Sequence, residues 1–453
     1  MTDAEPASAP PPADAFVLYG ATGDLAARML VPALCRVAAR RPFAALVAVG
    51  HDAVDADILR GRVRDHVGAI DAAQVPAFDA LAARIAFVGG DLGDDTVYAR
   101  VATALQHARR PIHYLAIPPA LFAPALEGLA HARLAADARV AIEKPFGHDL
   151  ASAVALDAVV ARTLVSSQVF RIDHFLAKDP VRNLADMRAR ATWLDALWSQ
   201  PTVAAIEITM AEAFGVGTRG AFYESTGVLR DVFQNHLLEL VALATMEPCP
   251  PADGDGFARS RIAALRAIAP LAPRDVVYGQ YDGYRGEAGV ARDSQVATYM
   301  AVRLAVHTPR LAGVPIRVRA GKAMALTATT LTLRLAGGDR LCFHLGPGAT
   351  GITLATERLA PGSRAAHVPV ALDAPFAHDE DRDAYVNVIE ALVAGDTSVS
   401  AHADGVHAAW RVVEPVLRAA IPVHRYARAS FGPAAADTLL PRGTQWLDPE
   451  ARA

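Results

Sequence analysis

The chain has 453 residues, which is too long for one ordinary domain, so we expect two. Hydrophobic residues make up 53% and charged residues 20%, and no apolar run approaches the roughly 20 residues that cross a bilayer, which excludes a membrane span. The net charge of −4, without a block of Lys and Arg, argues against nucleic acid and anionic membrane as partners.

The chain start and the cysteines bear on cellular context. Residues 1–14 are rich in Pro and Ala and lack the basic and apolar regions of a signal peptide, so we expect a disordered tail and a cytoplasmic protein. Cys35, Cys249 and Cys342 lie far apart and have no zinc-site spacing. We therefore expect buried small hydrophobic side chains and no metal.

Residues 15–145 alternate short apolar runs with Ala-rich helical segments. The expected strands are 15–20, 45–50, 84–90, 111–117 and 138–145, with helices over 24–39, 55–67 and 94–108. This alternation implies right-handed crossovers and a parallel sheet covered on both faces. We predict a Rossmann-like, doubly wound domain over residues 15–178, which is typical of NAD(P) binding.

The first expected strand leads directly into a glycine motif, GATGDL, at residues 20–25. Gly20 and Gly23 would let the backbone approach a pyrophosphate, which a helix N-terminus attracts. Thr22 and Asp24 are also common helix caps, so a capped helix after a glycine turn is the alternative. The position after the first strand of a βαβ unit favours the dinucleotide.

The end of the second expected strand bears on the choice of nucleotide. His51, Asp52 and Ala53 offer no Arg or Lys for a 2′-phosphate, which on charge alone favours NAD over NADP. Arg28 or Arg60 would have to reach in from a helix to change this.

The pattern changes after about residue 180. An alternating strand over 202–212 precedes a helix over 226–245, and further strands are expected at 296–306, 315–321, 330–337 and 340–346. No helix fits between the last three, so we expect adjacent antiparallel pairing, with Gly337 and Gly338 as a hairpin turn. Helices over 382–395 and 404–419 follow. We predict an α+β domain over residues 179–453 with a large, mainly antiparallel sheet.

Three islands of polar residues are not explained by apolar packing. They are RIDHFLAK at 171–178, RDVFQNH at 230–236 and RVRAGK at 317–322. Each has a structural alternative: Asp173 as a cap, His236 as a hydrogen-bonded core histidine, and Lys322 as a solvated strand end.

Together these segments resemble the glucose-6-phosphate dehydrogenase family from about residue 15 to residue 445. The matching segments are 20–26, 143–147, 171–178, 219–239, 246–248, 279–281, 313–322, 383–396 and 408–417. The resemblance implies an oxidoreductase of the oxidative pentose phosphate pathway that converts glucose 6-phosphate to 6-phosphogluconolactone. It further implies hydride transfer to NADP or NAD, a C-terminal domain for substrate binding and dimerisation, and a homodimer or homotetramer.

The resemblance also implies residue roles. His236 corresponds to the base that removes the C1 hydroxyl proton, a task for which its ordinary pKa is suited, and Asp173 orients it. The implied substrate-binding residues are His174 and Lys178, at the phosphate, with Glu212, Asp231, Lys322 and Lys144. The implied dinucleotide-binding residues are Gly20, Thr22, Gly23, Asp24, Leu25, Lys144 and Pro145.

Several positions depart from the family pattern. Ala27 stands where most members have Lys, Phe175 where a Tyr bonds the phosphate, Thr327 where a second basic residue is common, and Ala53 where an Arg holds the 2′-phosphate. The stretch between Lys322 and Asp383 is shorter than usual. We expect weakened binding of the sugar phosphate. NADP is the first candidate cofactor, and NAD is the second. A paralogue acting on another aldose or aldose phosphate, or a non-catalytic regulatory paralogue, is the alternative.

Overall fold

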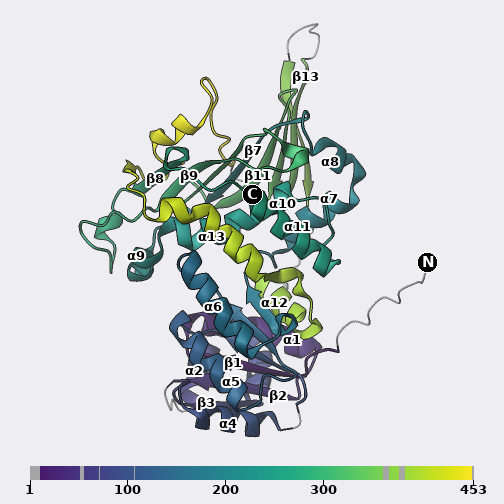
Figure 1. Ribbon diagram of the computed structural model, residues 1–453, viewed down its shortest axis with the longest axis vertical. Coiled ribbons are helices and arrows are strands. Elements are labelled where there is room, and N and C mark those ends of the chain that lie inside the picture. Colours follow the sequence, from purple (N-terminus) through teal and green to yellow (C-terminus); the bar gives the residue numbers. More distant parts are fainter. Residues whose placement is uncertain are drawn as a thin grey trace, which may run out of the picture. The chain divides into compact units, whose positions relative to one another are not determined.

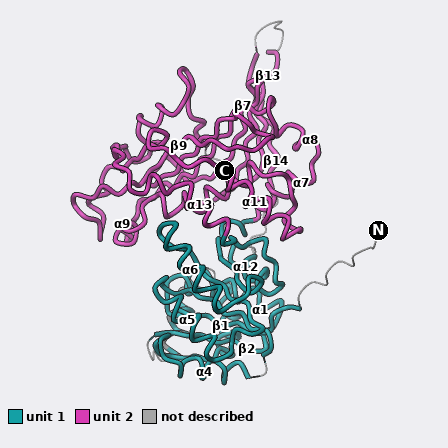
Figure 2. The backbone as a smooth tube through the Cα atoms, in the orientation of Figure 1, with its two compact units in different colours: residues 1–178, 379–403 teal, residues 179–378, 404–453 magenta. Residues whose placement is uncertain are grey.

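The computed structural model describes residues 11–51, 56–70, 72–106, 108–360, 367–376 and 383–450. The chain forms two compact units, shown in different colours in Figure 2. Unit 1 comprises residues 1–178 and 379–403, and unit 2 comprises residues 179–378 and 404–453. Among the described residues, no helix is long and apolar enough to cross a membrane.

Unit 1 is built on a seven-stranded sheet (Figure 1), in the order β15-β6-β5-β4-β1-β2-β3. The strands are β1 (Ala15–Tyr19), β2 (Ala45–Gly50), β3 (Ile85–Gly89), β4 (Pro111–Leu115), β5 (Arg139–Glu143), β6 (Val169–Ile172) and β15 (Ser400–Ala401). The first six pair in parallel, and β15 joins β6 antiparallel. Their carboxyl ends therefore lie along one edge of the sheet.

Helices cover both faces of this sheet. They are α1 (Val31–Arg40), α2 (Ala56–Ile70), α3 (Val75–Ala82), α4 (Asp95–Leu105), α5 (Phe122–His131), α6 (Leu150–Thr163) and α12 (Ala384–Ala394). Phe16 and Leu18 of β1 enter one apolar cluster with α1 and α12, whereas Val17 and Tyr19 enter a second cluster with α4 and α5. Because strand side chains alternate between faces, this division shows a sheet buried on both sides and confirms the doubly wound prediction.

The predicted division of the chain between residues 178 and 179 matches the two units, but the predicted domains differ from the units in two other places. The segment 379–403, expected in the C-terminal domain, belongs to unit 1, because α12 buries Val388, Ile389 and Leu392 in the same cluster as α1. The expected tail also extends too far: Ala13 is only 5% exposed, and its N–H donates to the Val393 carbonyl at 2.9 Å. Apolar periodicity shows that a helix needs a partner but does not show which one.

Unit 2 is built on a nine-stranded mixed sheet, in the order β14-β13-β12-β11-β7-β10-β9-β8-β16. The strands are β7 (Val203–Ala211), β8 (Val276–Tyr281), β9 (Tyr299–Leu304), β10 (Ile316–Gly321), β11 (Ala328–Leu335), β12 (Arg340–His344), β13 (Gly351–Leu359), β14 (His367–Pro375) and β16 (Val423–Tyr426). Antiparallel pairs predominate, as expected, and β7–β10 and β8–β16 are parallel.

The helices of unit 2 include a long continuous run that carries one of the polar islands. They are α7 (Asp179–Arg190), α8 (Thr192–Leu197), α9 (Gly220–Val228), the π-helix η6 (Leu229–Leu237), α10 (Leu238–Thr245), α11 (Gly254–Ala267) and α13 (Ala403–Leu417). Every residue of α10 is buried, so this helix anchors η6 in the core of the unit.

The expected strand pairing is confirmed in one place and wrong in another. β11 and β12 form the hairpin at Gly337–Gly338, where Gly338 has a φ of 95°. β10 and β11 do not pair, because β7 lies between them, parallel to β10 and antiparallel to β11. The connection from Lys322 to Thr327 is long enough to pass one strand, since neighbouring strands are about 5 Å apart.

Candidate active site

The glycine motif forms a tight turn between β1 and the first helix of unit 1. Gly20 has a φ of 78°, and a Cβ there would lie 2.2 Å from the Ala116 carbonyl oxygen, so no side chain fits. The Gly23 N–H donates to the Gly20 carbonyl at 2.9 Å, and a Cβ at Gly23 would lie 3.1 Å from the same oxygen.

The helix that follows this turn is α-helical at Asp24 and Leu25 and becomes the π-helix η1 (Ala26–Leu30). Thr22 and Asp24 are exposed beside the turn, and Leu25 is half-buried. The N–H groups of a first helical turn have no partner within the helix. This close-packed backbone cradle fits the pyrophosphate of a dinucleotide.

The two arginines considered for the 2′-phosphate each pair with a carboxylate on their own helix. Arg28 lies 2.8 Å from Asp24, and Arg60 lies 2.6 Å from Asp57. Ala53, where the family Arg is replaced, lies outside the described residues.

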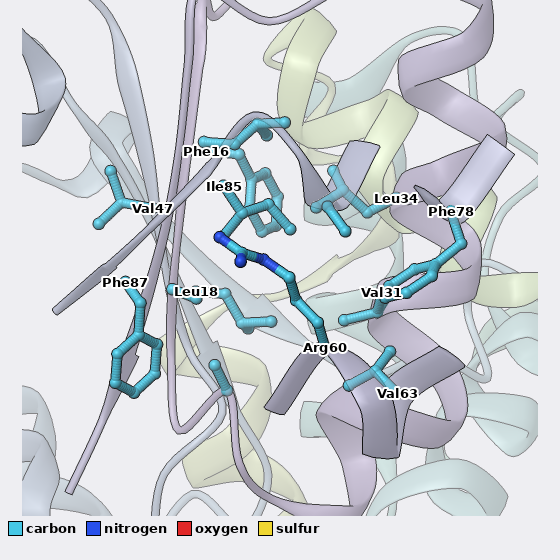
Figure 3. A pocket seen from close by; sticks show the side chains of 14 residues that line it. Phe16, Leu18, Val31, Leu34, Val47, Arg60, Val63, Phe78, Ile85 and Phe87 are labelled. Carbon is cyan, nitrogen blue, oxygen red and sulfur yellow. The ribbon is translucent and has the colours of Figure 1, made fainter. Parts of the chain in front are cut away.

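Arg60 also borders a small cavity, of about 50 Å³, next to the β-sheet of unit 1. Figure 3 shows its guanidinium among apolar side chains that include Phe16, Leu18 and Ile85. The cavity is too small for a nucleotide base. Arg60 is the one cation among the residues that line this cavity.

The EKP segment lies at the carboxyl end of β5. Glu143 is 5% exposed, Lys144 is half-buried and Pro145 is exposed. The Tyr114 hydroxyl donates to Glu143 Oε1 at 2.5 Å. Burial raises the pKa of the Glu143 carboxyl to about 7, against the opposing effects of the Tyr114 hydrogen bond and the charge of Lys144.

The next strand, β6, leads into a turn that carries Asp173, His174 and Lys178. Asp173 is 2% exposed, and its carboxylate accepts the Phe175 N–H at 3.1 Å. The His174 ring stacks on the Tyr385 ring with centroids 5.5 Å apart, and Lys178 Nζ lies 5.4 Å from the centre of the Phe175 ring. Phe175 is fully buried and offers no hydroxyl to a ligand.

In unit 2, the π-helix η6 holds Asp231 and His236. A π-helix hydrogen-bonds residue i to residue i+5, so these two residues lie one turn apart on the same face of the helix. An α-helix would direct them to different faces. His236 is 5% exposed, and its backbone N–H donates to the Asn235 side-chain oxygen at 2.6 Å.

Lys322 follows β10 and meets Asp231. Its Nζ lies 2.5 Å from Glu212 Oε2 and 3.6 Å from Asp231 Oδ2. The rings of Phe214 and Tyr223 lie 5.4 and 5.2 Å from the same atom. Burial and the two carboxylates raise the pKa of the Tyr223 hydroxyl, which stays neutral. Lys322 is therefore a buried, paired cation and not a solvated strand end.

The structure thus brings the candidate residues into two groups. Unit 1 holds the glycine turn, Lys144 and the turn with Asp173; unit 2 holds Glu212, Asp231, His236 and Lys322. Thr327 supplies no cation: its hydroxyl accepts the Ala213 N–H at 2.9 Å.

Two tyrosines and one glutamate of unit 1 were not predicted as site residues. Tyr114 and Glu143 stand inside expected strands and Tyr385 inside an expected helix, where apolar periodicity assigns them to the core. The signal that was available is Glu143 itself, because a carboxylate at the end of a buried strand needs a partner.

The chain matches two family models that together span most of its length. The NAD-binding domain of glucose-6-phosphate dehydrogenase matches residues 17–183, and the C-terminal domain of the same enzyme matches residues 185–447. The chain is 40% identical over 449 residues to glucose-6-phosphate 1-dehydrogenase 1 of Mycobacterium tuberculosis, covering 96% of each protein.

Solved structures give the same result. A glucose-6-phosphate 1-dehydrogenase from Mycobacterium avium superposes with a TM-score of 0.91 at 37% identity, covering 98% of this chain and 100% of that one. A glucose-6-phosphate dehydrogenase in complex with its substrate glucose-6-phosphate has a TM-score of 0.88 at 26% identity, with the same coverage.

These matches confirm the resemblance seen in the sequence and the predicted reaction, the oxidation of glucose 6-phosphate with a nicotinamide dinucleotide. The chain belongs to the glucose-6-phosphate dehydrogenase family.

Proposed function

We propose that His236 is the general base of this dehydrogenase and that Asp173 orients it. The observation that carries this assignment is the π-helical turn that aligns His236 with Asp231, which in turn contacts Lys322. A neutral imidazole takes the proton from the C1 hydroxyl, and a buried carboxylate stabilises the imidazolium that results. The dinucleotide, when bound, accepts the hydride from C1.

Glu212, Asp231 and Lys322 position the sugar in this proposal. Two carboxylates around one ammonium group offer acceptors and a donor to sugar hydroxyls while keeping the buried charges paired. Lys144, at the end of β5, contributes a further contact to the sugar from unit 1, which also carries the glycine turn.

The 6-phosphate is held by His174 and Lys178. Phe175 and Thr327 remove two contacts that relatives use, and each charge-assisted hydrogen bond contributes roughly 1.5–3 kcal/mol. We therefore propose a dehydrogenase that recognises the phosphate weakly.

Gly20, Thr22, Gly23, Asp24 and Leu25, with Lys144 and Pro145, bind the dinucleotide. NADP is the first candidate because the family favours it. NAD is accepted as well, since Arg28 and Arg60 are engaged by Asp24 and Asp57. We further propose a cytoplasmic enzyme that works as a homodimer or homotetramer.

One set of initial-rate measurements tests these assignments. The value of kcat/KM is measured for glucose 6-phosphate and for free glucose, each with NADP and with NAD. We expect glucose 6-phosphate to be preferred and both nucleotides to work. Equal kcat/KM values for free glucose and glucose 6-phosphate would show that the enzyme does not recognise the phosphate. A tenfold preference for NAD would show that the replacement of the family Arg by Ala53 determines the choice of nucleotide.

A further inference from the structure

Glu143 is a buried acid that the reaction described above does not use. It ends β5, and in the parallel pairing with β6 it lies opposite Ile172, the residue before Asp173. Two tyrosines hold it: Tyr114 of β4 donates to Oε1 at 2.5 Å, and the Tyr385 hydroxyl of α12 also hydrogen-bonds the carboxyl group. A carboxyl group that is buried this deeply needs hydrogen-bond partners, and the two tyrosine hydroxyls provide them.

The same tyrosine supports the phosphate-binding turn. The Tyr385 ring stacks on His174 at an interplanar angle of 13°, and Asn387, on the same helix, donates to the Ala177 carbonyl at 2.8 Å. Glu143 therefore connects through Tyr385 to the ring of His174, while Asn387 fixes the end of the turn.

The charged and titratable groups around Glu143 and Tyr385 come from four elements. They are Tyr114 on β4, Lys144 after β5, Asp173 and His174 after β6, and Tyr385 and Asp383 at α12, with Asp383 paired to Arg36 of α1 at 3.1 Å. Burial raises the pKa of the Glu143 carboxyl to about 7, and Asp173 acts in the same direction. A second negative charge next to Asp173 therefore develops as the pH rises through neutrality.

We propose that Glu143 is a positioning residue for sugar-phosphate binding. It holds the His174 ring in place through Tyr385, and the negative charge of Glu143 opposes binding of the anionic phosphate. The inference rests on the proposed role of His174 at the phosphate. Glu143 touches neither substrate nor cofactor in this account, so its effect appears in KM for the sugar phosphate and leaves kcat nearly unchanged.

The test compares KM for glucose 6-phosphate in the full-length enzyme and in Glu143→Gln between pH 6 and pH 8.5. Glutamine keeps one acceptor for Tyr114 and one donor for Tyr385 but does not ionise. Near pH 6 we expect similar KM values; by pH 8.5 the wild-type KM should exceed that of the variant by about three- to tenfold, the scale of one partly screened charge. The ionisation of the substrate itself is common to both enzymes and cancels.

Two further variants separate positioning from packing. Because the Tyr114 hydrogen bond lowers the pKa of Glu143, Tyr114→Phe should move the inflection of the KM profile to higher pH. Tyr385→Phe should raise KM across the whole range. Glu127→Gln, at an exposed position on α5, is the matched control, and its KM should depend on pH as in the wild type.

The outcomes are distinguishable. A KM profile in Glu143→Gln identical to that of the wild type, with KM raised in His174→Asn, would overturn this inference and leave the role of His174 intact. An unchanged KM in His174→Asn would remove the proposed phosphate contact itself. A pH-dependent change confined to KM for the dinucleotide would place the effect of Glu143 on the other ligand and overturn the inference as well.

Discussion

His236 lies in the core of unit 2, and its chemistry is separable from binding. Replacing it by asparagine keeps a polar side chain of smaller size and removes the base. We expect His236→Asn to lower kcat by about 10²–10⁴-fold, the usual contribution of a general base, while the affinity for glucose 6-phosphate stays close to that of the wild type. Steady-state kinetics and calorimetric titration measure the two quantities; a retained kcat would exclude His236 as the base.

The Glu143 carboxyl makes stability depend on pH in a direction opposite to that of most acidic residues. Its pKa is raised from 4.5 to about 7, so the folded protein keeps a proton that the unfolded chain releases between these values. The contribution to stability is complete below pH 4.5 and is lost as the pH rises through 7. Glutamine has no proton to lose.

We therefore expect the free energy of unfolding of the wild type, relative to Glu143→Gln, to fall between pH 5 and pH 8. The upper limit is about 3 kcal/mol, because each pH unit between 4.5 and about 7 contributes about 1.4 kcal/mol. Urea unfolding at the two pH values measures the difference, with Glu127→Gln as the exposed control. If the difference between wild type and Glu143→Gln is the same at both pH values, the carboxyl does not titrate in this window.

At the scale of elements, the glycine turn after β1 is the most constrained backbone of the proposed nucleotide site. Gly20→Ala places a Cβ 2.2 Å from the Ala116 carbonyl oxygen at a positive φ, so we expect a loss of about 1–3 kcal/mol of stability and weaker NADP binding. Gly61→Ala on α2 is the control, because no atom lies within 4 Å of the added Cβ and a helix gains roughly 0.5–1 kcal/mol from the change.

Thermal unfolding should show a loss of stability in Gly20→Ala and a gain in Gly61→Ala, and NADP titration should show weaker binding in Gly20→Ala only. A Gly20→Ala protein that binds NADP as tightly as the wild type would show that the turn does not approach the pyrophosphate.

The sequence predicts some elements well and others poorly, for identifiable reasons. β1, β2, β4 and β5 are short buried runs bounded by breaks, and the β11–β12 hairpin has a Gly-Gly turn, so each has a local signal. β14 has no buried residue in the structure, and its sequence, HVPVALDAP, contains two prolines, which are unusual inside a strand. The π-helix η6 has no sequence signature, because it differs from an α-helix only in hydrogen bonding to residue i+5 and not i+4.

At the scale of the whole molecule, chain order conceals which segments fold together. The family and the reaction could be predicted because GATGDLA, RIDHFLAK and RDVFQNH are specific sequences. The inclusion of residues 379–403 in unit 1 could not, because it depends on α12 packing against α1, more than 340 positions away along the chain, near the contact of Arg36 with Asp383. The same limit hides the Tyr385–Glu143 contact.

The outer edge of the unit 2 sheet is a candidate surface for the proposed dimer. β14 is the edge strand, and it pairs with β13, which is labelled in Figure 1. Leu372 on β14 is 59% exposed and Leu359 on β13 is 50% exposed. An edge strand with exposed leucines is a template for pairing and a costly surface to leave in water, so we expect a second copy of the chain to cover it.

We expect Leu372→Lys to shift the enzyme from dimer to monomer, because a lysine on an edge strand opposes pairing and cannot be buried without a partner. Sedimentation velocity at several concentrations measures the change. Val165→Lys, at a residue of unit 1 that is 64% exposed, is the matched control and should leave the assembly intact. If Leu372→Lys keeps the mass of the wild-type assembly, the dimer forms through another surface, since an ammonium group on this edge would otherwise be buried against its own copy.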